Sequence, residues 1–322
     1  MEQITPVFPP VVDSTMRSDF VACPQKFYNG YILKRALRGG SIHLVAGAAY
    51  AKGLEVIRTL VWGPEKLPLE DAIAEAIPKV WAEYGDMETP EFAQHKSPLN
   101  IVKALIAYFD KYNPETDHIQ PYIKKDGYPA VEFSFTLPTQ INHQDTGEPI
   151  LYAGRTDMLG VYQDSLWIVD DKTSSILGTA WDRSWALRGQ LTGYTFAAQQ
   201  YGFKAAGAIV RGISLLRSGA FGFSEPIEYR SPWHIERWWV QLHRDLARMV
   251  ACWQDKDEDH PWGYWDYNLA DACTAYGGCP FAQLCRVSNP EEWVQGNYEL
   301  RDWSPLDRNP LGRPQITSVF PS

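Results

Sequence analysis

The stretch "WIVDDKTSS", residues 167–175, runs from three apolar side chains into two carboxylates and a lysine. Its apolar start is typical of a buried β-strand. Because side chains alternate along a strand, Asp170 and Lys172 are expected on one face and Asp171 on the other. The sequence therefore predicts a carboxylate and an amine held side by side at the end of a buried strand.

Another acidic residue lies on the preceding predicted strand. Asp157 stands between apolar residues in "AGRTDMLG", and twelve residues separate it from Asp170, which is enough for a tight antiparallel return. The two carboxylates could then meet, and they repel unless a proton or a cation lies between them.

Mg²⁺ or Mn²⁺ suits such a pair, because these hard ions prefer oxygen ligands. In phosphodiester hydrolysis the ion polarises the phosphoryl oxygen and activates water, and Lys172 would orient that water or stabilise the charge on the phosphate. The alternative is an ordinary Asp–Lys ion pair at the end of a strand.

The composition is that of a folded, soluble protein. The chain has 322 residues, of which 45% are hydrophobic and 21% charged, enough for one large domain or two small ones. No apolar run is long enough to span a bilayer, and the amino terminus lacks the pattern of a signal peptide. We therefore expect a cytoplasmic protein.

Basic residues are concentrated in two segments, although the net charge is −9. No acidic residue occurs at positions 20–54 or 183–224. Such segments favour a local positive field that could bind phosphates, and the alternative is an ordinary solvated surface. Their basic residues are Lys26, Lys34, Arg35, Arg38 and Lys52 in the first, and Arg183, Arg188, Lys204, Arg211 and Arg217 in the second.

The hydrophobic pattern predicts an α-helical first third followed by a mixed region. After a short helical entry, helices are expected at 42–62, at 69–84 with Pro78 interrupting, and at 98–113. The strands and helix that follow are expected in the order βββαβ, at 130–138, 150–162, 164–173, 185–202 and 205–216. An amphipathic helix opens at Ser231 and Pro232, and the Pro-rich end of the chain is expected to be an extended tail.

Two predicted helices each place polar residues on a single face. Gln190 and Tyr194 are four residues apart and share a helical face, as do Gly47, Ala51 and Glu55. The ordered set of helix Glu, strand Asp, strand D-x-K and helix Q-x-x-x-Y resembles the PD-(D/E)xK nuclease superfamily, and within it the RecB-like nuclease domain. The resemblance runs from about Ser14 to Arg286.

The resemblance implies a restriction-endonuclease-like α/β fold, with a mixed sheet flanked by helices. It implies one RecB-like domain over residues 1–322, with a helical part at 14–115 holding Cys23 and Glu55, a nuclease core at 128–254, an iron–sulfur region at 255–287 and a C-terminal tail at 288–322. The implied catalytic residues are Lys172, Glu55, Gln190 and Tyr194, and the implied metal ligands are Asp157, Asp170 and Asp171, the last through its backbone carbonyl.

Four of the five cysteines form a further pattern. Five residues separate Cys273 from Cys279 and Cys279 from Cys285, and Cys23 stands alone near the start. Without a secretory signal, such thiols are expected to be reduced, and four of them suit zinc or an iron–sulfur cluster. The resemblance to RecB-like exonucleases of CRISPR-associated and phage types implies a 4Fe–4S cluster on Cys23, Cys273, Cys279 and Cys285. Cys252 is expected to be a core residue.

The implied activity is a metal-dependent DNA exonuclease that acts without sequence specificity, preferentially at ends of single-stranded DNA. One departure matters: Ala51 occupies the position where the RecB-like family often has a metal-binding histidine. Two alternatives therefore stay open, a weakly active or inactive DNA-binding or assembly subunit that keeps the fold, and an iron–sulfur redox protein.

DNA is the expected partner, with a homo-oligomer or a helicase or recombination partner also compatible with the resemblance. The tyrosines Tyr28, Tyr31 and Tyr50 could stack on exposed bases, although aromatic residues beside a helix are more often core. The residues expected to contact DNA phosphates are Lys26, Arg35, Lys52, Arg155 and Arg188.

Overall fold

The computed structural model describes residues 5–268, 271–274 and 278–306. These residues form two compact units. We call residues 41–134 and 155–235 the central unit, and the described parts of 5–40, 135–154 and 236–306 the terminal unit. The expected Pro-rich end, residues 307–322, lies outside the described residues.

Three helices and a 3₁₀-helix open the central unit: α3 (Ile42–Trp62), α4 (Leu69–Tyr84), η2 (Glu91–Lys96) and α5 (Pro98–Lys111). α3 and α5 pack closely at Gly53, where an added Cβ would lie 2.3 Å from Leu105 Cδ1. Ser97 caps α5 by accepting a hydrogen bond from the Asn100 backbone N–H at 3.3 Å, and Pro98 occupies the first turn, where its missing N–H does no harm.

One mixed sheet runs through the fold, in the strand order β1-β5-β6-β7-β8. β3 and β4 also pair with β5, and β9 pairs with β7. β5 and β6 are antiparallel, whereas β6 and β7 are parallel. The strands are β1 (Val11–Asp13), β3 (Gln120–Pro121), β4 (Val131–Asn142), β5 (Pro149–Tyr162), β6 (Ser165–Ser174), β7 (Ala205–Leu215), β8 (Phe221–Ser224) and β9 (Ile227–Tyr229).

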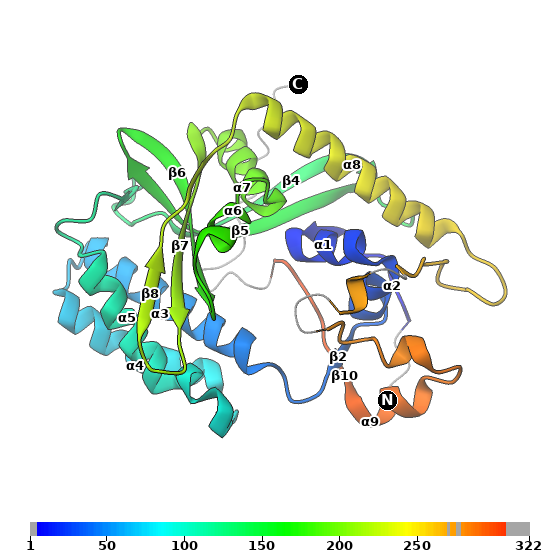
Figure 1. The fold of residues 1–322 in the computed structure, drawn as a ribbon. Helices are drawn as coiled ribbons and strands as arrows, with labels where there is room; N and C mark the ends of the chain where they lie inside the picture. Colours follow the sequence, from blue (N-terminus) through cyan, green and yellow to red (C-terminus); the bar gives the residue numbers. More distant parts are fainter. Residues whose placement is uncertain (1–4, 269–270, 275–277, 307–322) are drawn as a thin grey trace. The chain divides into compact units, whose positions relative to one another are not determined.

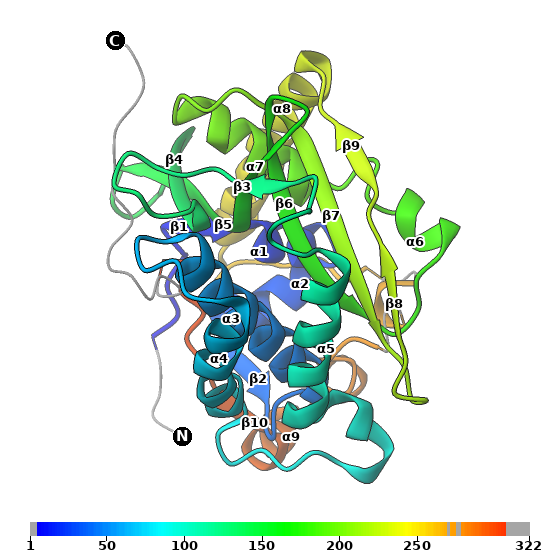
Figure 2. The same ribbon diagram turned by 90° about the vertical axis from the view of Figure 1, so that its left-hand side faces the viewer.

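Helices flank this sheet within the central unit. Figure 1 and Figure 2 show α3, α4 and α5 grouped beside β6 and β7, and an added Cβ at Gly47 of α3 would lie 3.6 Å from Thr173 Oγ1 of β6. Between β6 and β7 the chain forms α6 (Thr179–Arg183) and α7 (Gly189–Gln200), and α7 packs on both strands. The crossover helix allows β6 and β7 to be parallel.

The terminal unit contains both ends of the described chain. An aromatic cluster of Phe20, Phe27 and Trp265 lies in its interior. Its elements are β1, α1 (Ser14–Ala22), α2 (Pro24–Phe27), the π-helix η1 (Tyr28–Ile32), β2 (Arg35–Leu37), most of α8 (Pro232–Gln254), the 3₁₀-helices η3 (Asp271–Cys273) and η5 (Leu284–Arg286), α9 (Glu291–Asn297) and β10 (Tyr298–Leu300). The beginning of the predicted tail is therefore ordered, since β10 pairs antiparallel with β2.

The predicted mixed α/β fold is confirmed, with three local corrections. Pro78 does not interrupt α4, because residues 74 and 78 are exposed and water can satisfy the carbonyl that loses its partner. The helix predicted at 185–202 begins only at Gly189. Tyr50 is 2% exposed and belongs to the core, so it cannot stack on a base. Among the described helices, none combines the length and the apolar character needed to cross a membrane.

Candidate active site

The pairing of β5 with β6 brings the two predicted carboxylates together. Met158 pairs with Val169 in this antiparallel ladder, so the next positions along it are Asp157 and Asp170. The backbone N–H of Asp171 donates to Asp157 Oδ2 at 2.7 Å, which fixes the Asp157 carboxylate against β6.

Lys172 lies beside Asp170, as strand alternation predicts. Its Nζ is 2.5 Å from Asp170 Oδ2, and the Asp170 side chain is only 2% exposed. Burial lowers the pKa of Lys172, but the charges of Asp170 and Asp157 outweigh burial and raise it to about 12. Lys172 therefore stays charged and neutralises part of the carboxylate charge.

The ionised forms of both carboxylates are nevertheless destabilised. Burial and the charge of Asp170 raise the pKa of Asp157 to about 7. Burial also raises the pKa of Asp170, against the effect of Lys172. Such raised pKa values are typical of functional sites, and a bound cation would relieve the repulsion that contributes to them.

Glu132 on β4 is a member of this group that the sequence analysis missed. Its carboxylate lies 2.5 Å from Arg155 Nε, and burial together with the charge of Asp157 raises its pKa to about 8. Its φ of 52° is in the left-handed region, which is costly for a residue other than glycine and is found most often at functional sites. The only sequence signal was an acidic residue inside the apolar strand "AVEFSF".

Glu55 approaches the same group from α3. Its carboxylate is 2.8 Å from Lys52 Nζ, and its charge contributes to the raised pKa of Glu132. Ala51 lies one helical turn before Glu55, so the position that often carries a histidine in the RecB-like family has no ligand atom in its side chain.

The helix α7 supplies the last predicted pair. Gln190 Nε2 donates to the Tyr194 hydroxyl at 2.9 Å, as expected for two residues on one helical face. Arg188, immediately before α7, lies 5.4 Å over the Trp185 ring, and its charge opposes the raised pKa of Asp170. The described structure contains no direct hydrogen bond from Gln190 to the carboxylates.

Asp171 faces the other side of β6. Its Oδ2 lies 2.7 Å from Arg58 Nη1, and both side chains are almost completely buried, at 1% and 3% exposure. Burial opposes the charge of Arg58, but the charge of Asp171, Tyr108 and the hydrogen bond to Asp171 together outweigh burial and raise the pKa of Arg58. The Asp171 carboxylate is therefore committed to a structural ion pair, so that only its backbone groups face the predicted metal site.

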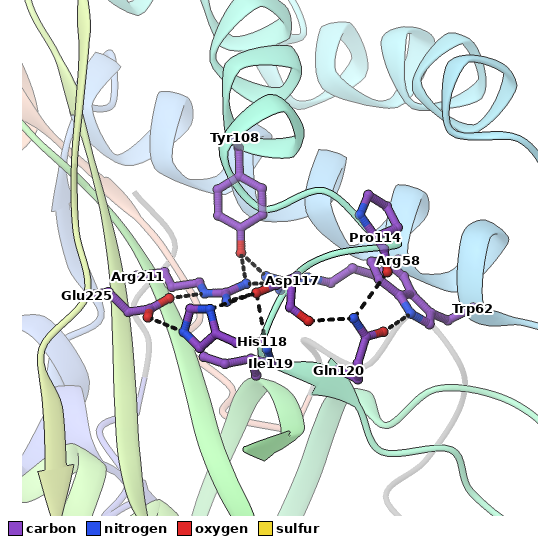
Figure 3. Close-up of polar contacts among 10 residues, drawn as sticks. All are labelled: Arg58, Trp62, Tyr108, Pro114, Asp117, His118, Ile119, Gln120, Arg211 and Glu225. Carbon is purple, nitrogen blue, oxygen red and sulfur yellow. Dashed lines mark hydrogen bonds and ion pairs between the residues drawn. The ribbon is translucent and has the colours of Figure 1, made fainter. Parts of the chain in front are cut away.

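Arg58 belongs to a larger buried network, drawn in Figure 3. Tyr108 Oη accepts hydrogen bonds from Arg58 at 2.6 Å and from Arg211 at 3.2 Å. Arg211 holds Asp117 through two short contacts of 2.7 and 2.6 Å, and Glu225 through a third of 2.8 Å. Each arginine in this network thus has a carboxylate partner.

The predicted DNA contacts fall in both units. Lys52, Arg155 and Arg188 lie in the central unit with the carboxylates. In the terminal unit, Lys26 is 2.7 Å from Asp19 and Arg35 is 3.6 Å from Glu291. Four of the five predicted phosphate contacts are therefore paired with an acidic residue in this structure.

The four cysteines predicted to act together all lie in the terminal unit. The Cys279 backbone N–H donates to the Cys273 carbonyl at 2.9 Å, and the Asn268 N–H donates to Cys23 Sγ at 3.4 Å. Burial raises the pKa of Cys285 to about 11, and the charges of Cys279, Cys23 and Cys273 add to this shift. Cys252 is half-buried, and burial raises its pKa to about 11.

Among the described residues, neither the carboxylates nor the four cysteines have the arrangement of a metal site. In the described part of the chain, no group of three or more His, Cys, Asp or Glu side chains has the arrangement of a metal site. The donor atoms of the two sets differ in kind: carboxylate oxygens suit Mg²⁺ or Mn²⁺, whereas cysteine thiolates suit zinc or an iron–sulfur cluster.

The antiparallel strands β5 and β6 of the mixed sheet thus carry Asp157 and the Asp170–Lys172 pair at one place. The family model of the PD-(D/E)XK nuclease superfamily matches residues 16–286, and the chain belongs to that superfamily. Nucleases of this superfamily usually use Mg²⁺ or Mn²⁺, and DNA is the substrate that the family implies.

Two solved structures are similar to this chain. The "Putative exonuclease" from Eubacterium rectale has 12% sequence identity and a TM-score of 0.43, over 82% of this chain and 87% of that one. The protein SSO0001 has 10% identity and a TM-score of 0.30, over 74% of this chain and 83% of that one. Among curated proteins, none matches this sequence.

Proposed function

We propose that the protein is a metal-dependent DNA exonuclease that hydrolyses phosphodiester bonds without sequence specificity, from the ends of single-stranded DNA. The observation that carries the proposal is the group of Asp157, Asp170 and Lys172, in which burial raises the pKa of both carboxylates, and the charge of Asp170 raises the pKa of Asp157 further, beside a charged amine. Structural ion pairs do not need this unfavourable proximity, whereas a cation-binding site does.

We assign a role to each residue of the proposed active site. Asp157 and Asp170 would hold Mg²⁺ or Mn²⁺, with a backbone group of Asp171, and the bound ion would polarise the phosphate and acidify water. Lys172 stays charged and is placed to stabilise the negative charge that develops on the phosphate. Glu55 and Glu132 add negative charge around the ion, and Gln190, Tyr194 and Arg188 are proposed to orient the substrate.

We also propose that Cys23, Cys273, Cys279 and Cys285 bind a 4Fe–4S cluster. The four cysteines come from two distant parts of the sequence, but all lie in the terminal unit. The charges of Cys279, Cys23 and Cys273 also raise the pKa of Cys285, which supports a shared site. Binding energy at such a site stabilises the fold, because the ligands are brought together only in the folded chain. Protein purified without oxygen should be brown and contain about four iron atoms per chain, and Cys279→Ala should remove both properties.

The decisive experiment uses end-labelled single- and double-stranded DNA with Mn²⁺, Mg²⁺ or a chelator. Wild-type protein should shorten labelled single strands only with a metal ion, and Asp170→Ala and Lys172→Ala should abolish the shortening. Asp126→Ala is the matched control, because Asp126 is exposed and contacts the neighbouring Lys124 and the Tyr128 backbone N–H, away from the carboxylate group.

One observation favours a second candidate function, a DNA-binding subunit without efficient cleavage. Ala51 removes the side-chain ligand that the RecB-like pattern often supplies. Tight DNA binding without shortening under any metal would establish this candidate. In that case Ala51→His, on the same helical face as Glu55, should increase cleavage if the missing ligand is the cause.

A further inference from the structure

Asp171 connects the two faces of β6 through a single residue. Its backbone N–H donates to Asp157 Oδ2 at 2.7 Å, and its own Oδ2 accepts from Arg58 Nη1 at 2.7 Å. Within the described residues, Asp171 Oδ1 has no hydrogen-bond partner, so the polar contact that fixes this side chain is the one with Arg58. A displacement of Arg58 would therefore reach the N–H group that orients the Asp157 carboxylate.

The pairing of β5 with β6 does not by itself fix Asp171 against Asp157. The antiparallel ladder ends at Met158 and Val169, one position before the two carboxylates. Beyond this point the Asp171 N–H donates to a side chain, which has rotational freedom that a backbone acceptor lacks. On its other edge β6 stays paired with β7, where Asp171 lies beside Arg211. The geometry at Asp157 therefore depends on the contacts that hold β6 from β7 and from α3.

The Arg58 guanidinium is itself held from a second side. Its Nη2 donates to Tyr108 Oη at 2.6 Å, and the same hydroxyl accepts from Arg211 Nη1 at 3.2 Å (Figure 3). Arg211 is fixed in turn by two contacts with Asp117 and one with Glu225. Both guanidinium groups are buried, and a planar guanidinium donates in fixed directions. The network therefore leaves Arg58 little freedom to move away from Asp171.

We propose that Arg58 is a positioning residue of the proposed metal site, which acts through Asp171 from the opposite face of β6. It holds the Asp171 backbone where the N–H orients the Asp157 carboxylate, so that Asp157 and Asp170 can bind one divalent cation together. The proposal rests on the proposed function, because it takes these two carboxylates as ligands of Mg²⁺ or Mn²⁺. Groups that orient metal ligands commonly change the metal affinity about ten- to hundredfold when they are removed.

A purely structural role for Arg58 leads to a different expectation. If Arg58 only neutralises the buried Asp171, replacing both charged groups with apolar ones should restore the metal site together with the fold. If Arg58 also positions Asp171, the double variant Arg58→Met, Asp171→Leu should fold but bind the ion weakly, because apolar contacts lack the direction of a hydrogen bond. One positive and one negative charge are removed together, so the formal charge around Asp157 does not change.

Electron paramagnetic resonance of free Mn²⁺, measured without DNA, gives the dissociation constant of the ion for each variant of the full chain. The double variant should raise this constant about ten- to hundredfold. Tyr108→Phe removes the hydroxyl that holds Arg58 but leaves the contact with Asp171, so it should raise the constant less, by about two- to fivefold. In both variants the rate of DNA cleavage should fall much more at a low Mn²⁺ concentration than at a saturating one.

Two controls separate positioning from a general loss of stability. Asp170→Asn should remove the same Mn²⁺ binding, which identifies the bound ion as the one at the carboxylates. Ile101→Ala removes a fully buried side chain of α5, about two helical turns before Tyr108, and lowers the stability within the apolar core. Because Ile101 has no hydrogen-bonding group, its replacement should leave the Mn²⁺ dissociation constant within about twofold of the wild-type value.

An unchanged Mn²⁺ dissociation constant in the folded double variant would overturn the proposal and leave the proposed function intact. If the double variant does not fold, an unchanged constant in Tyr108→Phe overturns it in the same way. An equal weakening in Ile101→Ala would also overturn it, because loss of stability would then explain the effect. Weaker Mn²⁺ binding by the variants of a protein that does not shorten DNA would support the positioning role and reject the exonuclease activity. Mn²⁺ binding that Asp170→Asn leaves unchanged would overturn both proposals.

Discussion

Asp170 and Asp171 are neighbours in the sequence, but the two faces of β6 place them in contrasting environments. On the Asp170 face, burial raises the pKa of Asp157 and of Asp170 in spite of Lys172, and the charge of Asp170 raises the pKa of Asp157 further. On the Asp171 face, the charges complement one another, and Asp171 raises the pKa of its partner Arg58. In the second arrangement the carboxylate has a basic partner within the chain, whereas a bound cation would relieve the repulsion in the first one.

The contrast explains why the sequence motif alone does not distinguish function from structure. Both aspartates are buried, and both lie within hydrogen-bonding distance of a basic side chain. What differs is the presence of further carboxylates near Asp170. We infer that unrelieved repulsion, more than the presence of an ion pair, marks the site that binds a metal ion.

The largest effect is expected for Asp170→Asn, which should abolish activity but leave the stability of the fold nearly unchanged. Asp170→Asn should lower DNA hydrolysis at least about a thousandfold, because it removes a proposed metal ligand. It should change the free energy of unfolding by no more than about 1 kcal/mol, since it also removes a charge that repels Asp157. Rates on end-labelled DNA and urea unfolding of the same protein preparation measure both quantities. A loss of stability comparable to that of an Arg58 variant would contradict the proposed division between the two faces.

The next largest effect is expected on the other face. Arg58→Met should lower the free energy of unfolding by about 3–5 kcal/mol, because it leaves Asp171 as a buried, unpaired carboxylate. The double variant Arg58→Met, Asp171→Leu should recover most of this loss, since no charge then remains without a partner. Urea unfolding of both variants measures the difference.

An exposed ion pair provides the control for that experiment. Lys124 and Asp126 lie 3.1 Å apart, but their side chains are 43% and 58% exposed. Lys124→Met should therefore change the free energy of unfolding by less than about 1 kcal/mol. An equally large loss in this variant would show that the Arg58 result does not arise from burial.

The smallest of the three effects concerns Glu132. Glu132→Gln should raise the Mn²⁺ concentration needed for half-maximal hydrolysis about ten- to hundredfold, because it removes negative charge beside Asp157. The rate at saturating Mn²⁺ should change much less. A loss of rate with no change in the Mn²⁺ requirement would instead indicate that Glu132 acts on the substrate.

Several parts of the molecule could be predicted from local sequence. The helix at 42–62 has the bounds of α3, and the alternation in "WIVDDKTSS" places Asp170 and Lys172 on one face and Asp171 on the other. The twelve-residue separation of Asp157 and Asp170 predicts their meeting, because the β5–β6 return is short and antiparallel. The spacing of Gln190 and Tyr194 likewise predicts their hydrogen bond.

The tertiary structure alone decided which charges have partners. Arg58 and Arg211 look like isolated charges within apolar segments, and only the packing of α3, α5 and β7 joins them through Tyr108. Glu132 likewise acquires its contact with Arg155, and Lys96 its contact with His43, only from the folding of the chain. Periodicity fixes the face on which a side chain lies, because it is a local property of the backbone. Charge compensation depends on which faces meet, and that is settled only when the whole chain packs.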